Sequence, residues 1–173
     1  MGKTEEHLKA AFAGESQARN KYTFYAKIAR KEGYTYIAKI FEETADNEMR
    51  HAKDELALLN GIGDTAANLE AAMNGEDYET ITMYPEFAKD AEAEGNKAAA
   101  NLFRLIAKIE AHHRERYRKL LEMVKNGTVY KREHPIKWKC SVCGYIHEGK
   151  EPPKNCPCCK HAMDFFEPAN LDI

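Results

Sequence analysis

The hydrophobic pattern predicts four long helices. Apolar residues recur at steps of three and four, the period of a helix with one buried face, over residues 4–32, 35–60, 76–94 and 97–126. A glycine directly follows each of these segments, and glycine is the residue that most often ends a helix. Four amphipathic helices of this length predict a mainly α fold built around a four-helix bundle.

The third segment and the link before it are less regular than the rest. Pro85 lies inside residues 76–94 and predicts a kink near Met83 and Tyr84, because proline cannot donate its backbone hydrogen bond. The polar stretch before this segment is too long for a tight helix hairpin, and residues 69–73 have the composition of a short additional helix.

The pattern changes after residue 128. Aromatic and β-branched residues and five cysteines, all between positions 140 and 159, predict short strands and turns. About 40 residues cannot bury a sufficient core alone, so this part needs a metal or disulfides. We therefore expect two domains, a helical bundle over residues 1–133 and a small metal-knuckle domain over 134–173.

Composition excludes several classes of function. The chain has 173 residues, of which 31% are charged, and its formal net charge is -2. The two signs are mixed, so we expect no nucleic-acid partner and no anionic membrane surface. No apolar run approaches the ~20 residues of a membrane span, and the N-terminus lacks an apolar signal region. Paired Cys-x2-Cys spacing then indicates metal binding in a reducing, cytoplasmic setting.

Two Glu-x2-His pairs carry the strongest chemical signal. Glu48 with His51 and Glu110 with His113 each lie in a predicted helix, where residues three apart share a face. Two such pairs, with a glutamate from each of two other helices, form the ligand set of a carboxylate-bridged two-metal site in a bundle. The other two helices offer Glu15, Glu76 and Glu79: Glu15 from the first, Glu76 and Glu79 from the third.

Two interpretations that need no metal compete with a metal site. Any single glutamate in this charged chain is best explained as a surface residue. As a set, however, inward carboxylates without countercharge would cost more than the ~5–15 kcal/mol that stabilises a domain. A buried salt-bridge network with Arg19, Arg50 or Arg114 is the other alternative, and it leaves the histidines unexplained. Oxygen-rich ligands with two imidazoles favour iron or manganese, and iron is our interpretation.

At this point the chain resembles the rubrerythrin family over almost its whole length. The resemblance is carried by the following motifs: Phe12-Ala13-Gly14-Glu15-Ser16-Gln17-Ala18-Arg19, Glu48-x2-His51-Ala52, Glu76-x2-Glu79 ahead of Met83-Tyr84-Pro85, Glu110-x2-His113, and the cysteine tail after Trp138. It implies a ferritin-like di-iron bundle followed by a rubredoxin-like domain.

The resemblance also implies roles for single residues. The expected ligands of the two irons are Glu15, Glu48, Glu76, Glu79, Glu110 and His113. In the family's pattern His51 becomes a ligand when Glu79 is released on reduction. Tyr22 and Tyr84 match tyrosines that line the site, although from the sequence alone they are equally well explained as core aromatics.

The cysteines form a second metal motif. Cys140, Cys143, Cys156 and Cys159 have the spacing of two knuckles around one tetrahedral metal, which suits a structural zinc ribbon as well as iron. Trp138 flanks the first knuckle, as does Tyr145, and both resemble rubredoxin, so we expect one iron in a four-thiolate centre. The x2 spacing leaves Cys158 as a spare thiol, and Lys160 stands where free rubredoxins usually have glycine, so the sequence does not fix the backbone of that knuckle.

The implied function is a non-haem di-iron peroxidase that reduces hydrogen peroxide to water and protects against oxidative stress. Its electrons would come through the four-thiolate iron from rubredoxin or a reductase that uses NAD(P)H. A head-to-tail homodimer would bring the tail of one subunit near the bundle of the other. The alternatives are a ferritin-like ferroxidase that handles iron, and a structural or electron-transfer protein whose bundle holds zinc or no metal.

Overall fold

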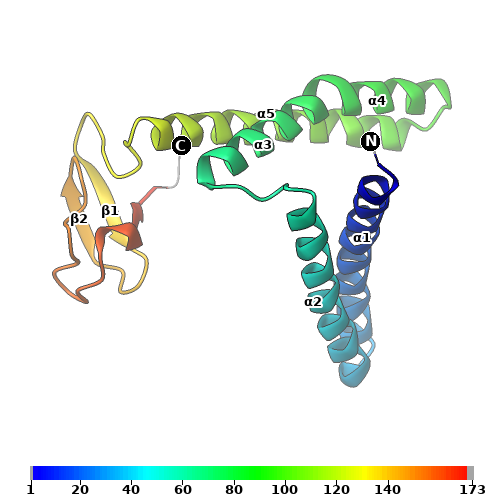
Figure 1. Ribbon diagram of the computed structural model, residues 1–173, viewed down its shortest axis with the longest axis horizontal. Helices are drawn as coiled ribbons and strands as arrows, with labels where there is room; N and C mark the ends of the chain where they lie inside the picture. The colour runs from blue at the N-terminus through cyan, green and yellow to red at the C-terminus, as the bar shows by residue number, and fades with distance from the viewer. Residues whose placement is uncertain (1, 171–173) are drawn as a thin grey trace. The chain divides into compact units, whose positions relative to one another are not determined.

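The computed structural model describes residues 2–170, which divide into two compact units at Gly63 and Asp64 (Figure 1). Among the described residues, the first unit comprises residues 2–63 and the second residues 64–170. Helices dominate both units, and a small three-stranded sheet follows the last helix. None of the helices within residues 2–170 combines the length and apolar character that crossing a lipid bilayer requires.

The first unit is a pair of helices, α1 (Lys3–Lys31) and α2 (Thr35–Leu58). Gly33 joins them with a φ of 89°, a conformation that favours glycine, and the Tyr34 amide donates to the Ala29 carbonyl at 2.8 Å to close the turn. Small side chains let the two backbones approach closely. The buried residues of this pair are all alanines: Ala26, Ala29, Ala38, Ala45 and Ala52.

The second unit begins with three segments that follow one another directly: α3 (Thr65–Tyr78), the π-helical η1 (Glu79–Met83) and α4 (Tyr84–Ala93). The turn at Gly95 leads to α5 (Lys97–Lys125). The sequence pattern predicted that the third helical segment starts at residue 76. This was wrong, because α3 starts at Thr65. The side chain of Asp64 accepts a hydrogen bond from the Ala67 amide at 2.9 Å and starts the helix early.

This early start shortens the link between the units to residues 59–64, which is less than the sequence pattern indicated. The predicted irregularity near Met83 and Tyr84 is confirmed in place, since the π segment ends at Met83. Pro85 has no amide hydrogen, so it cannot continue the regular hydrogen bonding of an α-helix at this point.

The two helix pairs repeat each other along the chain at a spacing of 62 residues. The same residue type stands at three equivalent pairs of positions: tyrosine at 22 and 84, phenylalanine at 41 and 103, and glutamate at 48 and 110. In each pair one arginine–glutamate ion pair joins the helices, but with the charges exchanged. These pairs are Arg30 with Glu42, and Arg104 with Glu92. The sequence pattern had revealed this repeat only in the two Glu-x2-His motifs.

One residue is inserted in the second copy of the repeat. Glu15 and Tyr22 are seven positions apart, whereas Glu76 and Tyr84 are eight apart. A π-turn accommodates a single extra residue without rotating the helix on either side of it, and η1 lies within this interval. Glu79, the first residue of η1, therefore belongs to a π-helical stretch that has no equivalent in α1.

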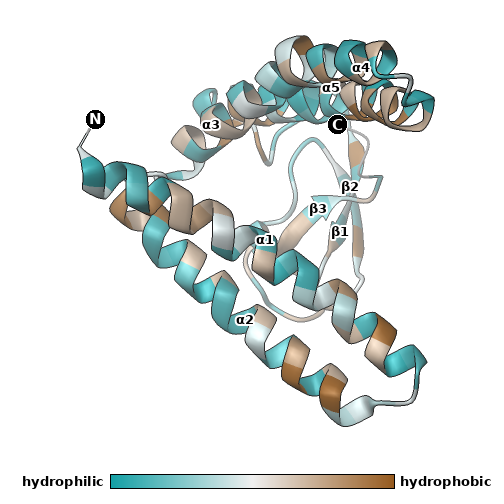
Figure 2. Ribbon diagram, turned by 90° about the vertical axis from the view of Figure 1, so that its right-hand side faces the viewer, coloured by the Kyte–Doolittle hydropathy of each residue, from teal (hydrophilic) through white to brown (hydrophobic). Residues whose placement is uncertain are grey.

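Each helix pair also packs a cluster of three aromatic rings. The clusters occupy equivalent positions in the repeat, with nearest ring centroids 5.7 Å apart in both. Figure 2 shows that apolar and polar segments alternate along the helices of each unit. The rings are Tyr22, Tyr25 and Phe41 in the first unit, and Tyr84, Phe87 and Phe103 in the second.

The C-terminal part is an antiparallel sheet of β1 (Ile136–Cys140), β2 (Ile146–Gly149) and β3 (Phe166–Pro168), in the order β2-β1-β3. The short helical turn η2 (Met163–Phe165) precedes β3. Trp138 is fully buried here and donates its indole N–H to the Gly149 carbonyl at 2.9 Å. The guanidinium of Arg132 lies 5.2 Å from the centre of the same ring, a cation–π contact.

If η1 contains an inserted residue, deleting one residue there should be tolerated better than deleting one residue from α1. Removing Thr80, whose buried hydroxyl has no hydrogen-bond partner, should convert η1 to regular helix and leave the protein folded. Removing Arg19 from α1 should be far more damaging, because no bulge absorbs the ~100° rotation between Glu15 and Tyr22. Thermal unfolding followed by circular dichroism compares the two. Equal loss of stability would contradict the assignment of an inserted residue.

Candidate metal centres

The first cluster joins α1 and α2. The Nδ1 atom of His51 lies 2.9 Å from a carboxylate oxygen of Glu48 and 3.9 Å from one of Glu15. Glu48 and His51 are one helical turn apart on α2, so the helix itself fixes their pairing. The Glu48 side chain is only 16% exposed, so the three ligands, two carboxylates and one imidazole, form a partly buried group.

The second cluster repeats this arrangement in the other unit. The Nδ1 atom of His113 lies 2.6 Å from a carboxylate oxygen of Glu110 and 3.6 Å from one of Glu76. Glu110 is 14% exposed, close to the value for Glu48. The two units thus present the same set of two carboxylates and one imidazole, held by the same helix geometry.

Both clusters bring like charges together. A hydrogen bond with Glu48, followed by burial, raises the pKa of Glu15. Burial, followed by a hydrogen bond with Glu110, raises the pKa of Glu76. Paired carboxyls resist ionisation unless positive charge is added, and a bound cation reverses this preference. The donor sets therefore fit metal ions.

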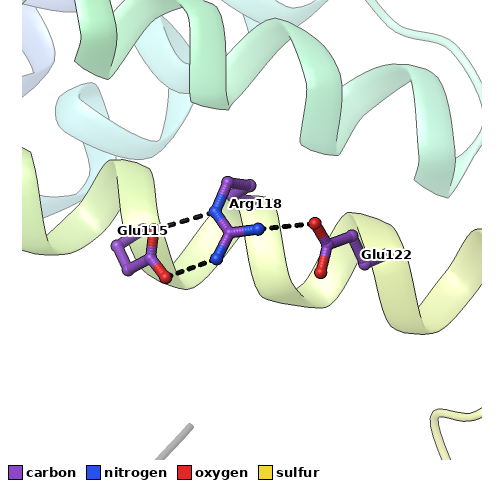
Figure 3. A network of polar contacts seen from close by, with 3 residues as sticks. All are labelled: Glu115, Arg118 and Glu122. Carbon is purple, nitrogen blue, oxygen red and sulfur yellow. Dashed lines mark hydrogen bonds and ion pairs between the residues drawn. The ribbon is translucent and has the colours of Figure 1, made fainter.

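The arginines do not provide the missing positive charge. Arg50 pairs with Asp54 at 2.8 Å and Arg114 with Asp77 at 2.7 Å, so neither of these ion pairs uses a cluster glutamate. Figure 3 shows that Arg118 is held by Glu115 and Glu122 of its own helix. The salt-bridge alternative is thus not realised by the ion pairs within residues 2–170.

Glu79 and the two tyrosines lie outside these groups of ligand atoms. Glu79 is not among the three ligands of the second cluster, but its charge raises the pKa of Glu76 and Tyr84. Burial is the largest cause for Tyr84, followed by the charges of Glu79 and Glu110. Tyr84 therefore keeps its proton beside the carboxylates. Tyr22, its counterpart, packs against Phe41 in the first unit.

The four expected cysteines form a third group. The sulfur atoms of Cys140 and Cys159 are 3.6 Å apart, and those of Cys143 and Cys156 are 3.7 Å apart. Metal–sulfur bonds of ~2.3 Å in a tetrahedron place sulfurs ~3.8 Å apart. The spacing thus fits one tetrahedral metal and not a disulfide, in agreement with the free state of all five cysteines.

Hydrogen bonds show that the two knuckles share one geometry. The Gly144 amide donates to the Cys140 carbonyl, and the Lys160 amide donates to the Cys156 carbonyl, both at 2.9 Å. Lys160 adopts a φ of 66° and Gly144 a φ of 77°, so lysine takes the left-handed conformation usually given to glycine. The substitution at Lys160 therefore leaves the knuckle intact.

Backbone amides also assign the cysteine register. Burial raises the pKa of Cys156, but the amides of Cys159 and Cys158, with the neighbouring thiols, lower it to about 6. The Tyr145 amide lowers the pKa of Cys143, yet the other thiols raise it to about 12 overall. Without a cation, adjacent thiols cannot all ionise. Cys158 contributes its amide, and its exposed side chain is not one of the four ligands.

Comparisons with known proteins agree with this geometry. A family model described as rubrerythrin matches residues 6–121, and a second, for the rubredoxin-like domain of rubrerythrin, matches residues 138–167. The chain belongs to the rubrerythrin family. Rubrerythrins are di-iron oxidoreductases with a rubredoxin-like domain, and peroxide reduction is the activity typical of them. The Glu/His clusters and the four cysteines are accordingly iron sites.

Individual relatives cover nearly the whole chain. A rubrerythrin of Porphyromonas gingivalis is 49% identical over 96% of this chain and 90% of its own length. Rubrerythrin-1 of Clostridium acetobutylicum is 49% identical over 95% of this chain and 93% of its own. A solved structure of nigerythrin in a partially reduced state is 37% identical, covers 97% of this chain and 87% of its own, and has a TM-score of 0.38.

Two features of the sites were not predicted from the sequence. The π-turn that holds Glu79 has no composition signal beyond the nearby proline. It becomes visible only when the spacing of Glu15 and Tyr22 is compared with that of Glu76 and Tyr84. The amides that donate to the cysteine sulfurs belong to the backbone, so side-chain motifs cannot reveal them.

The cysteine register makes a prediction. Changing Cys158 to serine should leave the tail metal and its visible spectrum unchanged, because Cys158 acts through its backbone amide. Changing Cys159 to serine should weaken or abolish the four-thiolate spectrum. Absorption spectra and metal content of the two purified variants provide the measurement. Loss of the spectrum in the Cys158 variant would show that the register is wrong.

Proposed function

We propose that this rubrerythrin-family protein is a peroxidase that reduces hydrogen peroxide to water at a di-iron site. The observation that carries the proposal is the repeated cluster of two carboxylates and one imidazole in each unit. Each cluster supplies ligands for one metal and a carboxylate that can bridge to a second. A four-thiolate electron-transfer site in the same chain supports a redox function rather than iron storage.

The proposed site combines both clusters. Glu48 and Glu110 would bridge the two metals, because each belongs to a Glu-x2-His pair and carries two oxygens. Glu15 and Glu76 would be terminal ligands, and His113 would bind through its imidazole. Two bound irons would each supply one electron, and these two electrons with two protons would convert one peroxide to two waters.

The residues around the site would manage protons and ligand exchange. Tyr84 keeps its hydroxyl proton beside Glu79 and Glu110, so it can donate a hydrogen bond to a peroxide oxygen. Glu79 begins the π-turn, where the helix departs from regular hydrogen bonding. We assign to Glu79 and His51 alternate ligation of one iron, with Tyr22 as the counterpart of Tyr84 in the first unit.

Electrons would enter through the four-cysteine site. Cys143 is exposed and the neighbouring Val142 is 49% exposed, which gives a donor protein an apolar point of approach to the sulfur. The proposed donor is rubredoxin or a reductase that uses NAD(P)H. Free thiols suit a reducing cytoplasm, and a head-to-tail homodimer would shorten the electron path between tail and bundle.

Ferroxidase activity is the second candidate. The carboxylate clusters alone would suit it, since ferritin-like bundles of this kind hold two irons. It does not account for the four-thiolate site.

Anaerobic reduction followed by hydrogen peroxide tests the proposal. A sample with about three irons per chain should lose its thiolate–iron absorption bands on reduction and regain them rapidly with peroxide. Oxygen should restore the bands more slowly than peroxide does. A ferroxidase would instead respond to added ferrous iron and oxygen, and would leave peroxide largely unconsumed.

Changing Glu110 to alanine should abolish peroxide turnover, because Glu110 pairs with His113 and is the proposed bridge. The tail spectrum should stay intact, because the four cysteines are untouched. Glu115→Ala is the matched control, since Glu115 lies on the same helix and contacts Arg118 instead (Figure 3). Turnover assays and tail absorption measure both variants. Retained turnover in the Glu110 variant would refute the site assignment.

A further inference from the structure

Each unit carries half of the proposed site and an apolar face without a partner inside that unit. Tyr25 and Ile40 in the first unit are each 45% exposed. Their counterparts in the repeat, Phe87 and Leu102, are 44% and 54% exposed. Large side chains left open at equivalent positions of both helix pairs indicate that each pair is built to cover another.

The length of the link between α2 and α3 decides whether the apolar faces of the two units can cover each other within one chain or only between two chains. Six residues, 59–64, separate the last residue of α2 from the first of α3. Even fully extended, the seven steps from Leu58 to Thr65 reach at most ~25 Å. Part of this reach is already used, because the Gly61 amide donates to the Leu56 carbonyl at 2.9 Å and turns the chain back after α2.

A ferritin-like bundle needs a longer link than this. In that fold one long crossover runs along the bundle between the second and third helices. Glu48 lies ten residues before the end of α2, which is ~15 Å of helix. Glu76 lies eleven residues after the start of α3, which is ~16 Å. If both residues bind one metal pair, the crossover must span ~31 Å along the axis, without counting the sideways step.

We propose that the ferritin-like bundle forms between two copies of the chain, with α1 and α2 of one copy covering α3, α4 and α5 of the other. Two chains then make two complete sites, and each site takes Glu15, Glu48 and His51 from one copy and Glu76, Glu110 and His113 from its partner copy. This rests on the proposed joint site, and it makes exchange of the helix pair a requirement for metal binding.

Mixing two defective variants tests the exchange. Glu48→Ala and Glu110→Ala each break both sites of their own dimer. A mixed dimer has one site with both defects and one with none. Random pairing makes about half of the dimers mixed, so bundle iron should return to about a quarter of the wild-type amount. If instead each chain formed its bundle from its own helices, every site would carry one of the two defects and no bundle iron would return.

The measurement is iron per chain beyond the tail iron, on differently tagged variants that are co-expressed. The unselected mixture should hold about a quarter of the wild-type bundle iron, and mixed dimers purified through both tags should hold about half, because one of their two sites is intact. His51→Ala with His113→Ala is a second pair that follows the same logic. Absence of mixed dimers, or mixed dimers without bundle iron, would overturn the exchange. Regained iron without peroxide turnover would confirm the exchange and refute the proposed peroxidase instead.

Lengthening the link between α2 and α3 tests whether its shortness is what forces the exchange between chains. Inserting about 14 glycine and serine residues between Ile62 and Gly63 lets each chain close on itself, since a flexible tether gives an effective concentration of ~mM. At micromolar protein the mixed variants should then regain little iron. The same insertion after Gly33 is the control and should leave the regained iron unchanged. Full recovery with the longer link would show that link length does not force the exchange.

Discussion

Negative charge on the inner faces of the helices is the constraint on which the rest of the structure depends. Each unit gathers two carboxylates around one imidazole, with the bridging candidates Glu48 and Glu110 largely buried. Such groups are stable only when they are protonated or matched by positive charge. Nearby arginines pair with aspartates elsewhere, so the clusters are left for metal ions. The helices form the scaffold that holds these ligands in position.

The repeat explains how one scaffold provides two similar clusters and one difference. Equivalent positions 62 residues apart hold the aromatic rings, the interhelical ion pair and the Glu-x2-His motif. The second copy departs from the first by one inserted residue, which the π-turn absorbs. Glu79 stands in that turn, so the carboxylate with no counterpart in the first unit lies where the backbone is least regular.

The cysteine domain also contains a repeat, in which two knuckles have the same backbone geometry. Its two knuckles share hydrogen bonds at positions 16 residues apart, Gly144 with Cys140 and Lys160 with Cys156. Four thiols at tetrahedral spacing replace most of the hydrophobic core that so short a segment cannot build. Trp138 and Phe166 supply the buried hydrophobic part, and Trp138 is held by its hydrogen bond to Gly149 and by Arg132 over its ring.

The sequence by itself determined the helices, the ligand motifs and the cysteine spacing, because these depend on contacts within one or two helical turns or within one knuckle. The Glu-x2-His pair of each cluster, such as Glu48 with His51, is brought together by helical period alone. The third ligand, Glu15 or Glu76, comes from another helix, and the packing of the helix pair places it beside the other two. Tertiary structure decided the rest. The helix start at Asp64, and hence the short link, depends on a cap that competes with a polar loop. The π-turn and the φ of Lys160 depend on packing and backbone hydrogen bonds that composition does not encode.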